Sequence, residues 1–169
     1  MTKEKDIIGR ETLVDFTENI VNIPAKIDTG ADGSAVWASD IRVDENNLLH
    51  FKLFDKSSPY YTGEDFVSDK YSVASVRSAS GDKTIKFRTY LWVKIKGRRV
   101  RALFGLSDRK VHRYPVLIGR RTLNGKFIVD VSVNENINPK SPKPHTGKLN
   151  QELKKDPQKF YQKYYSEEK

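Results

Sequence analysis

Regular alternation of hydrophobic and other residues is the clearest pattern in the chain, and it runs from residue 85 to residue 106. Its first part places Ile85, Phe87, Thr89, Leu91, Val93 and Ile95 on one side and Lys86, Arg88, Tyr90, Trp92, Lys94 and Lys96 on the other. A period of two is typical of a half-buried β-strand. After a tight turn at Gly97 and Arg98, the alternation resumes at Val100, Ala102, Phe104 and Leu106. The pattern therefore predicts a β-hairpin.

Other short hydrophobic runs, separated by turn residues, predict an all-β domain. The expected strands are residues 12–16, 23–28, 35–37, 50–54, 72–77, 115–118 and 126–132. Short strands with frequent turns favour a small closed barrel or a sandwich. One short helix is expected over residues 120–124. Residues 55–69 are expected to form a loop or an irregular hairpin, because they contain Pro59, Gly63 and scattered acidic residues.

The last fifth of the sequence differs in composition from the rest. Residues 134–147 contain three prolines and no periodic hydrophobic pattern, which indicates a linker. Beyond it, leucines and aromatic residues alternate with lysines and predict one or two short amphipathic helices, with Asp156 and Pro157 starting the second. We therefore expect a domain over residues 1–134, a linker over 135–147 and a basic amphipathic extension over 148–169. The extension either packs on its own domain, stays disordered or docks onto a partner.

Composition limits the classes of protein that fit. The 169 residues are enough for one domain with a hydrophobic core, and without cysteine there is neither a disulfide nor a thiolate metal site. No hydrophobic run approaches the roughly 18 residues that cross a membrane. The charged first six residues are not followed by the hydrophobic segment of a signal peptide, so we expect a cytoplasmic protein. The net charge of +9 is compatible with acidic proteins, nucleic acid or ribosomes as partners, or with solvated lysines alone.

The segment Asp28-Thr29-Gly30-Ala31 carries the strongest indication of chemistry. It follows a hydrophobic run that begins at Ile23. Glycine lets the backbone turn sharply, and the threonine hydroxyl can hydrogen-bond to nearby backbone. An acidic residue presented in this way at the end of a strand is how an aspartic-peptidase catalytic loop reads, although the same tetrapeptide also suits an ordinary turn.

A second segment, residues 116–120, ends a hydrophobic run with Gly119 and Arg120, and with it the chain resembles the retropepsin-like aspartic peptidases. More closely, it resembles the bacterial family often labelled "putative ATP-dependent zinc protease". The matching pieces, which span roughly residues 6 to 133, are 7–11, 25–31 with 34–35, 76–78 with 80–81, 116–121 and 125–131. The resemblance implies a retropepsin-like closed barrel, with a C-terminal helical extension following it here.

The resemblance also implies roles for individual residues. The catalytic loop is expected at Asp28, Thr29 and Gly30. Because the chain has a single Asp-Thr-Gly, a second copy of Asp28 must come from a homodimer partner, so that two carboxylates share one proton. The residues expected to contact a peptide substrate are Ala31, Asp32, Ile118 and, in a flap that closes over the substrate, Arg77, Ser78, Ser80 and Gly81. Gly119 and Arg120 are expected to be structural, with Arg120 paired to Asp32.

Neither zinc nor a nucleotide is expected as a cofactor, despite that family label. The sequence lacks a His-Glu-x-x-His motif, and His50, His112 and His145 are isolated from one another. It also lacks the glycine-rich phosphate loop that ends in Gly-Lys-Ser/Thr. Trp37 stands where members of the bacterial family commonly have a histidine, which weakens any proposal of a metal site there.

Several functions remain open at this point. Members of the bacterial family sometimes occur beside enzymes that add glutamate to ribosomal proteins, so the resemblance implies acidic or poly-glutamate protein tails as substrates. Alternatively, the barrel lacks activity and binds nucleic acid or a ribosome through the basic and aromatic face that begins at Lys86. A third reading is an inert scaffold that binds a partner through its C-terminal extension.

Overall fold

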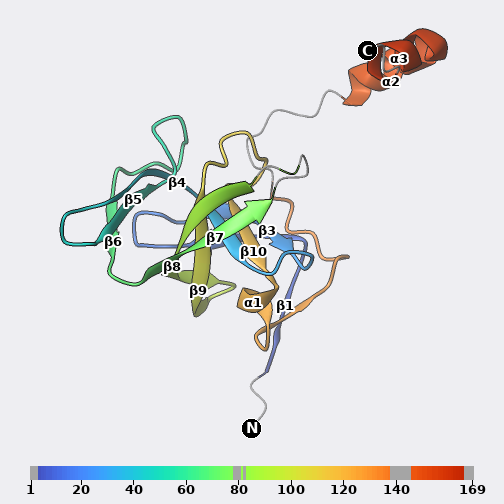
Figure 1. The fold of residues 1–169 in the computed structure, drawn as a ribbon. Coiled ribbons are helices and arrows are strands. Elements are labelled where there is room, and N and C mark those ends of the chain that lie inside the picture. Colours follow the sequence, from blue (N-terminus) through green and yellow to red (C-terminus); the bar gives the residue numbers. More distant parts are fainter. Residues whose placement is uncertain (1–3, 78–80, 82, 138–145, 166–169) are drawn as a thin grey trace.

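The computed structural model describes residues 4–77, 81, 83–137 and 146–165, and Figure 1 shows its strands and helices. The strands are β1 (Asp6–Ile8), β2 (Glu11–Asp15), β3 (Ile23–Asp28), β4 (Ser34–Val43), β5 (Leu49–Leu53), β6 (Asp65–Ser68), β7 (Tyr71–Arg77), β8 (Lys83–Ile95), β9 (Arg98–Ser107), β10 (Val116–Gly119) and β11 (Phe127–Val129). The helices are α1 (Arg120–Leu123), α2 (Thr146–Lys155) and α3 (Pro157–Tyr164). The mostly β fold with short helices is as the sequence predicts.

Nine strands form one hydrogen-bonded sheet in the order β10-β3-β2-β8-β9-β4-β5-β6, with β7 paired to β8. A further pairing joins β10 to β4, so the hydrogen bonds lead from β10 through β3, β2, β8, β9 and β4 back to β10. Strands β1 and β11 pair in parallel as a separate two-stranded sheet. Strand β10 therefore lies between β3, which ends at Asp28, and β4, which begins at Ser34. The loop of residues 29–33 joins these two strands.

The predicted hairpin is β8 and β9, paired from Arg88 with Gly105 to Ile95 with Arg98. Its turn residues are Lys96 and Gly97, one position earlier than expected, and both have positive φ values, of 50° and 78°. Two-residue hairpin turns of this kind match the twist of the strands, and they favour glycine because L side chains resist positive φ. The prediction of the hairpin is confirmed, with a shifted turn.

Two strands, β1 and β6, are not predicted from the sequence. Strand β1 is three residues long and pairs with β11, more than a hundred residues away. Strand β6 lies inside the segment 55–69, which was expected to be a loop or an irregular hairpin. It pairs antiparallel with β5, and Phe66 stacks on Phe51 with ring centroids 5.4 Å apart. Both strands exist because of a partner that local sequence periodicity does not reveal.

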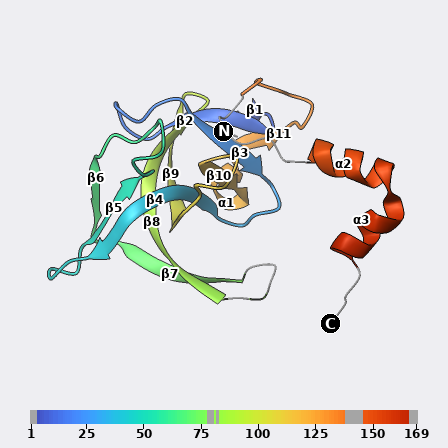
Figure 2. The same ribbon diagram turned by 90° about the horizontal axis from the view of Figure 1, so that it is seen from above.

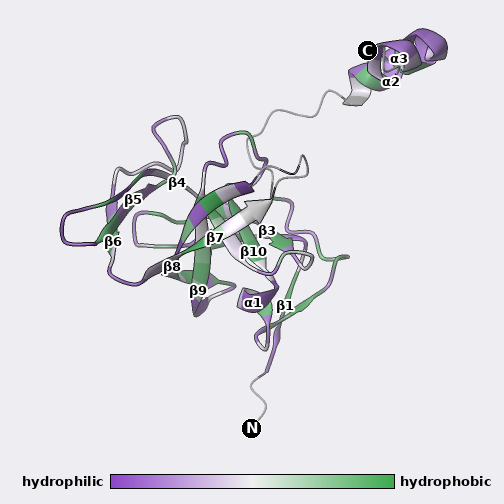
Figure 3. Ribbon diagram, in the orientation of Figure 1, coloured by the Kyte–Doolittle hydropathy of each residue, from purple (hydrophilic) through white to green (hydrophobic). Residues whose placement is uncertain are grey.

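The core is one cluster of hydrophobic side chains enclosed by the sheet. Its largest fully buried members are Phe51, Phe54, Phe104, Ile8, Ile20 and Ile23. Figure 3 shows the hydrophobic colouring along the central strands, whereas α2 and α3 are mostly hydrophilic. The inward residues of β8 from Leu91 onward and those of β9 from Val100 onward contribute to this core. Ile85, which was expected on the buried side, is 72% exposed because it lies where β8 pairs with β7 in the projecting hairpin.

The two C-terminal helices form where the sequence predicts short amphipathic helices. Asp156 caps α3 by accepting a hydrogen bond from the backbone N–H of Lys159 at 3.0 Å, and Pro157 occupies the first turn. Glu152 of α2 binds Lys163 at 2.6 Å and accepts from the Tyr164 hydroxyl at 3.1 Å, which holds the helices together. Within the described part of the chain, no helix is long and apolar enough to cross a membrane.

Candidate active site

Strands β3 and β10 place Asp28 beside the Gly-Arg pair. They run in parallel, with Ile118 opposite Ile27 and Gly119 opposite Asp28. The two segments that carry the sequence resemblance, about ninety residues apart, therefore end side by side. Asp28 is the last residue of β3, so its carboxylate lies at the end of the strand, where the loop of residues 29–33 begins.

The loop of residues 29–33 is fixed from two sides. The backbone N–H of Ala31 donates to the carbonyl of Asp28 at 3.3 Å and closes the turn. From the other side, the first residues of α1 reach across, because the N–H of Arg120 donates to the Ala31 carbonyl at 2.8 Å and the N–H of Arg121 donates to the Asp32 carbonyl at 3.1 Å. The start of α1 thus fixes the backbone that presents Asp28.

The carboxylate of Asp28 is partly accessible, with 27% of its side chain exposed. One oxygen, Oδ1, accepts a hydrogen bond from the N–H of Gly30 at 3.1 Å. The other, Oδ2, lies 3.7 Å from the Lys26 ammonium. Thr29 and Gly30 are themselves exposed. A single carboxylate that is held by its own loop and open to solvent has room for a second group to approach.

The guanidinium group of Arg109 also interacts electrostatically with Asp28, which the sequence alone did not indicate. Burial lowers the pKa of the Arg109 guanidinium, and the negative charge of Asp28 acts in the opposite direction. Its Nε donates to the carbonyl of Tyr114 at 3.1 Å, which ties together the loop before β10. Only its place in the sequence could have indicated this, because Arg109 belongs to the loop that leads into β10, and β10 pairs with β3.

A buried pair of hydroxyl groups supports the site from beneath. Ser34 and Thr122 share a hydrogen bond of 2.7 Å, and Ser34 Oγ accepts from the N–H of Gly119 at 3.1 Å. These contacts connect the start of β4 to the end of β10 and to α1. Ser34 belongs to the matched motif, but nothing in the sequence indicated that Thr122 is its partner.

The expected ion pair between Asp32 and Arg120 is present in the structure. The guanidinium of Arg120 donates to Asp32 Oδ1, and this hydrogen bond is the main reason that the pKa of Asp32 is lowered. Both side chains are exposed, at 66% for Asp32 and 57% for Arg120. In the single chain the pair is therefore solvent-facing, and its attraction is screened by water and salt.

The residues expected to bind substrate belong to the loop after Asp28, to β10 and to the expected flap. Ala31 and Asp32 lie in the loop after Asp28. Ile118 is 0% exposed, so its side chain packs in the core instead of facing a substrate, whereas the neighbouring Leu117 is partly exposed. Successive residues of a strand point to opposite sides, which explains the exchange.

The flap residues are described only in part. The backbone of Arg77 pairs with Lys83 at the end of the β7–β8 hairpin, and Gly81 has a φ of 88° that suits glycine in its turn. Ser78 and Ser80 lie outside the described residues. Figure 2 shows the hairpin projecting from the sheet on the side where the loop after β3 also lies.

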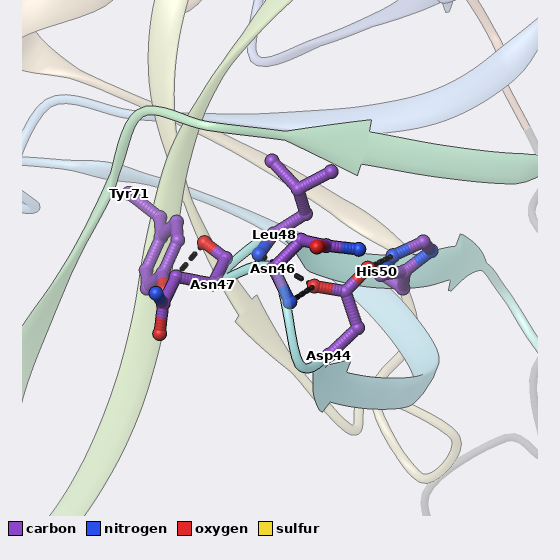
Figure 4. Close-up of polar contacts among 6 residues, drawn as sticks. All are labelled: Asp44, Asn46, Asn47, Leu48, His50 and Tyr71. Carbon is purple, nitrogen blue, oxygen red and sulfur yellow. Dashed lines mark hydrogen bonds and ion pairs between the residues drawn. The ribbon is translucent and has the colours of Figure 1, made fainter.

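Neither of the two histidines that the structure describes, His50 and His112, makes a hydrogen bond or an ion pair with Asp28, and His145 lies outside the described residues. Figure 4 shows His50, at the start of β5, beside the β4–β5 turn, where its Nε2 lies 2.8 Å from Asp44 Oδ2. The other oxygen of Asp44 accepts from the N–H groups of Asn46 and Leu48, which makes this a turn-stabilising cluster. His112 lies in the loop before β10, and its pKa is lowered by burial and then by Arg109 and Lys86. Among the described residues, no group of three or more potential metal ligands occurs.

Comparisons with known proteins bear on the fold and on the family of the chain. The crystal structure of Lpg0085 from Legionella pneumophila subsp. pneumophila str. Philadelphia 1, a protein of unknown function, superposes with a TM-score of 0.60. It is 20% identical, and the match covers 79% of this chain and 98% of that one, which shows a shared fold. A search of curated proteins finds no match. A family model described as RimB-like, "Retropepsin-like aspartic endopeptidase RimB", matches residues 7–140. Because this model spans most of the sequence, the chain belongs to the RimB-like family of retropepsin-like aspartic endopeptidases.

Proposed function

We propose that this protein hydrolyses peptide bonds as a homodimer, with Asp28 from each subunit forming the catalytic dyad. Two carboxylates about 3 Å apart do not both ionise readily, so the pair holds one shared proton and titrates as a unit. The ionised member accepts a proton from the attacking water, while the protonated member donates to the carbonyl oxygen of the substrate. Thr29 and Gly30 hold the loop that presents each carboxylate.

The observation that carries this proposal is the parallel pairing of Asp28 with Gly119. It places an accessible carboxylate in a loop fixed by the start of α1. The sequence contains a single Asp-Thr-Gly, so a dyad needs a second chain, and a two-fold axis beside Asp28 is the simplest arrangement. We infer that the six strands whose pairings lead back to β10 act as a small closed barrel that makes this frame rigid.

Substrate would enter beneath the β7–β8 hairpin. A flap that closes over a peptide excludes water and completes the site. We assign Arg77 and Gly81 to this role because of their place at the end of the hairpin, and Ser78 and Ser80 because the family resemblance implies it. Ala31 and Asp32 are assigned to the floor beside the dyad. Leu117 replaces Ile118 as the candidate contact from β10.

Acidic peptides, including poly-glutamate tails, are the substrates that the charges favour. The Lys26 ammonium group lies 3.7 Å from the Asp28 carboxylate, and the Arg109 guanidinium interacts with Asp28 electrostatically. The whole chain carries a net charge of +9. Positive charge around a cleft raises the local concentration of a negatively charged chain and its rate of encounter. The family resemblance implies the same class of substrate.

The test is a subunit-mixing experiment with Asp28→Asn, which keeps the shape of the side chain and removes the carboxylate. The variant alone should lose cleavage of a glutamate-rich fluorogenic peptide while it keeps its circular dichroism and sedimentation behaviour. Added in excess to wild-type protein under conditions of subunit exchange, it should also suppress the wild-type activity, because mixed dimers contain one carboxylate. Cleavage by the variant at the wild-type rate would rule out Asp28 as the catalytic residue.

A specific observation also supports a second candidate function, nucleic-acid binding by the outer face of β8 and β9. There, Arg99 lies over Trp92 at 4.4 Å and Arg101 over Tyr90 at 4.6 Å, and both rings remain about half exposed. Aromatic rings and guanidinium groups stack on bases. Lys86 and Arg88 are less exposed than the sequence suggested, so this face begins at Tyr90. Fluorescence anisotropy with single-stranded RNA, compared between wild-type protein and Trp92→Ala, would test the candidate.

A further inference from the structure

A recess of about 420 Å³ opens beside β3, and more positive than negative side chains line it. Three cationic side chains, Arg10, Lys26 and Arg113, line it together with one acidic residue, Glu11. The rest of the lining is Tyr114, the side-chain amides of Asn134 and Asn136, and the apolar Ile137. The recess therefore carries an excess of positive charge and additional hydrogen-bond donors, which is the lining that a carboxylate requires.

The recess adjoins the catalytic carboxylate. Lys26 lies in its lining, and the ammonium group of Lys26 is 3.7 Å from Asp28 Oδ2. Arg10 is fixed to the same strand, because its carbonyl accepts a hydrogen bond of 2.9 Å from the N–H of Ile27. Gly9, the residue before it, lies so close to the backbone of Val133 that a side chain would overlap it. The position of Arg10 is therefore set by the fold.

The one carboxylate in the recess already has a partner. Glu11 accepts a hydrogen bond from the Tyr114 hydroxyl. Burial, and after it Glu11, raises the pKa of Tyr114, while the positive charges of Arg113 and Arg10 act in the opposite direction. Both guanidinium groups thus lie near this hydroxyl. In the part of the chain that the structure describes, neither Arg10 nor Arg113 is within ion-pairing distance of a carboxylate, so each can accept an acidic ligand.

Resting on the peptidase function above, we propose that this recess is the subsite that binds the side-chain carboxylate of the substrate residue next to the scissile bond. Arg113 and Arg10 are its specificity-determining residues. A guanidinium group binds a carboxylate through two parallel hydrogen bonds, so the recess distinguishes glutamate from its uncharged isostere glutamine. In a symmetric dimer, two such recesses flank the dyad, one on each side of the bond that is cleaved.

The experiment compares two fluorogenic peptides that differ at this one substrate position, with glutamate in one and glutamine in the other. Wild-type protein should prefer the glutamate peptide. Arg113→Gln should lower the ratio of kcat/KM for the glutamate peptide to that for the glutamine peptide by about tenfold, through a higher KM for the glutamate peptide. Arg42→Gln is the matched control, since Arg42 is an exposed arginine of β4 in the hairpin with β5, outside the recess, and it should leave the ratio unchanged.

Binding separates this proposal from the proposed reaction. The Asp28→Asn variant should bind a fluorescent hexaglutamate more tightly than hexaglutamine, and adding Arg113→Gln should weaken the hexaglutamate binding about tenfold. If wild-type protein cleaves neither peptide but this binding difference is found, the reaction is wrong and the recess is a binding site for acidic side chains. If cleavage occurs and Arg113→Gln changes neither the ratio nor the binding, the subsite is wrong and the reaction stands.

Discussion

Gly119 lies directly against the backbone carbonyl of Gly33, so closely that a Cβ atom on Gly119 would overlap it. This contact is what lets the end of β10 run beside the loop after Asp28. The requirement is steric, because the φ angle of Gly119 is −90° and suits any residue. A glycine in the second motif is therefore needed by the geometry of the first.

Replacing Gly119 should consequently disrupt the site. Gly119→Ala should lower the free energy of unfolding by about 3 kcal/mol, since overpacking against backbone cannot be relieved by a rotamer change. Gly33→Ala is the matched control, because a Cβ atom there would meet nothing within 4 Å, and it should leave stability nearly unchanged. Chemical denaturation measures both. Equal stability of the two variants would contradict the contact.

The buried hydroxyl pair below the loop makes a second prediction. Ser34→Ala should lower the free energy of unfolding by roughly 1–3 kcal/mol, because Thr122 and the N–H of Gly119 lose a buried partner. Thr122→Ser keeps the hydroxyl and should cost less. Denaturation curves of the two variants, measured together with peptide cleavage, would show whether the pair supports the active loop. Equal or negligible losses would show that the hydroxyl groups do not matter.

Some residues and strands around the site can be identified from the sequence, and others cannot. Asp28 and the Gly119-Arg120 pair can be identified because each ends a hydrophobic run with distinctive residues. The hairpin of β8 and β9 can be identified from its period of two. Strand β6 could not, because it depends on pairing with β5, and Arg109 could not, because its proximity to Asp28 arises from the path of a loop. Local patterns report on neighbours along the chain, whereas these contacts form only in the fold.

The Asp32–Arg120 pair should contribute in a pH-dependent way. The pKa of Asp32 is lowered below its ordinary value of 3.8, chiefly by the hydrogen bond from Arg120. A lowered pKa favours the folded state above 3.8, and this contribution is lost as the pH falls through the lowered value. The difference in stability between wild-type protein and Arg120→Ala should therefore be constant above pH 3.8, decline as the pH falls below 3.8, and vanish below the lowered pKa of Asp32.

Because the pair is exposed, its effect on the single chain should be small and close to that of Arg121→Ala. A larger effect of Arg120→Ala on dimer dissociation than on unfolding would show that a partner subunit covers the pair. Sedimentation and denaturation of the two variants, measured in parallel, make the comparison. A large loss of stability in the isolated chain would contradict the exposed geometry.

Activity should depend on neither metal nor nucleotide. A carboxylate dyad activates water without a metal ion, and the sequence lacks both the zinc-peptidase helix motif and the phosphate loop. Treatment with a chelator and addition of ATP should each leave the turnover of a glutamate-rich peptide unchanged, under conditions that inactivate a zinc endopeptidase used as control. Loss of activity on chelation, with recovery on addition of zinc, would show that a metal takes part.

Catalysis should require the dimer, because each chain supplies one Asp28. Specific activity should fall as the protein is diluted through its dimer dissociation constant, and it should follow the dimer fraction measured by sedimentation at the same concentrations. Two copies joined by a flexible linker are the control, since the second subunit then has a high effective concentration, and their specific activity should resist dilution. A monomer that cleaves at the full rate would mean that a second acidic residue of the same chain completes the dyad. In that case Asp28→Asn would still inactivate the protein, but it would no longer suppress wild-type subunits on mixing.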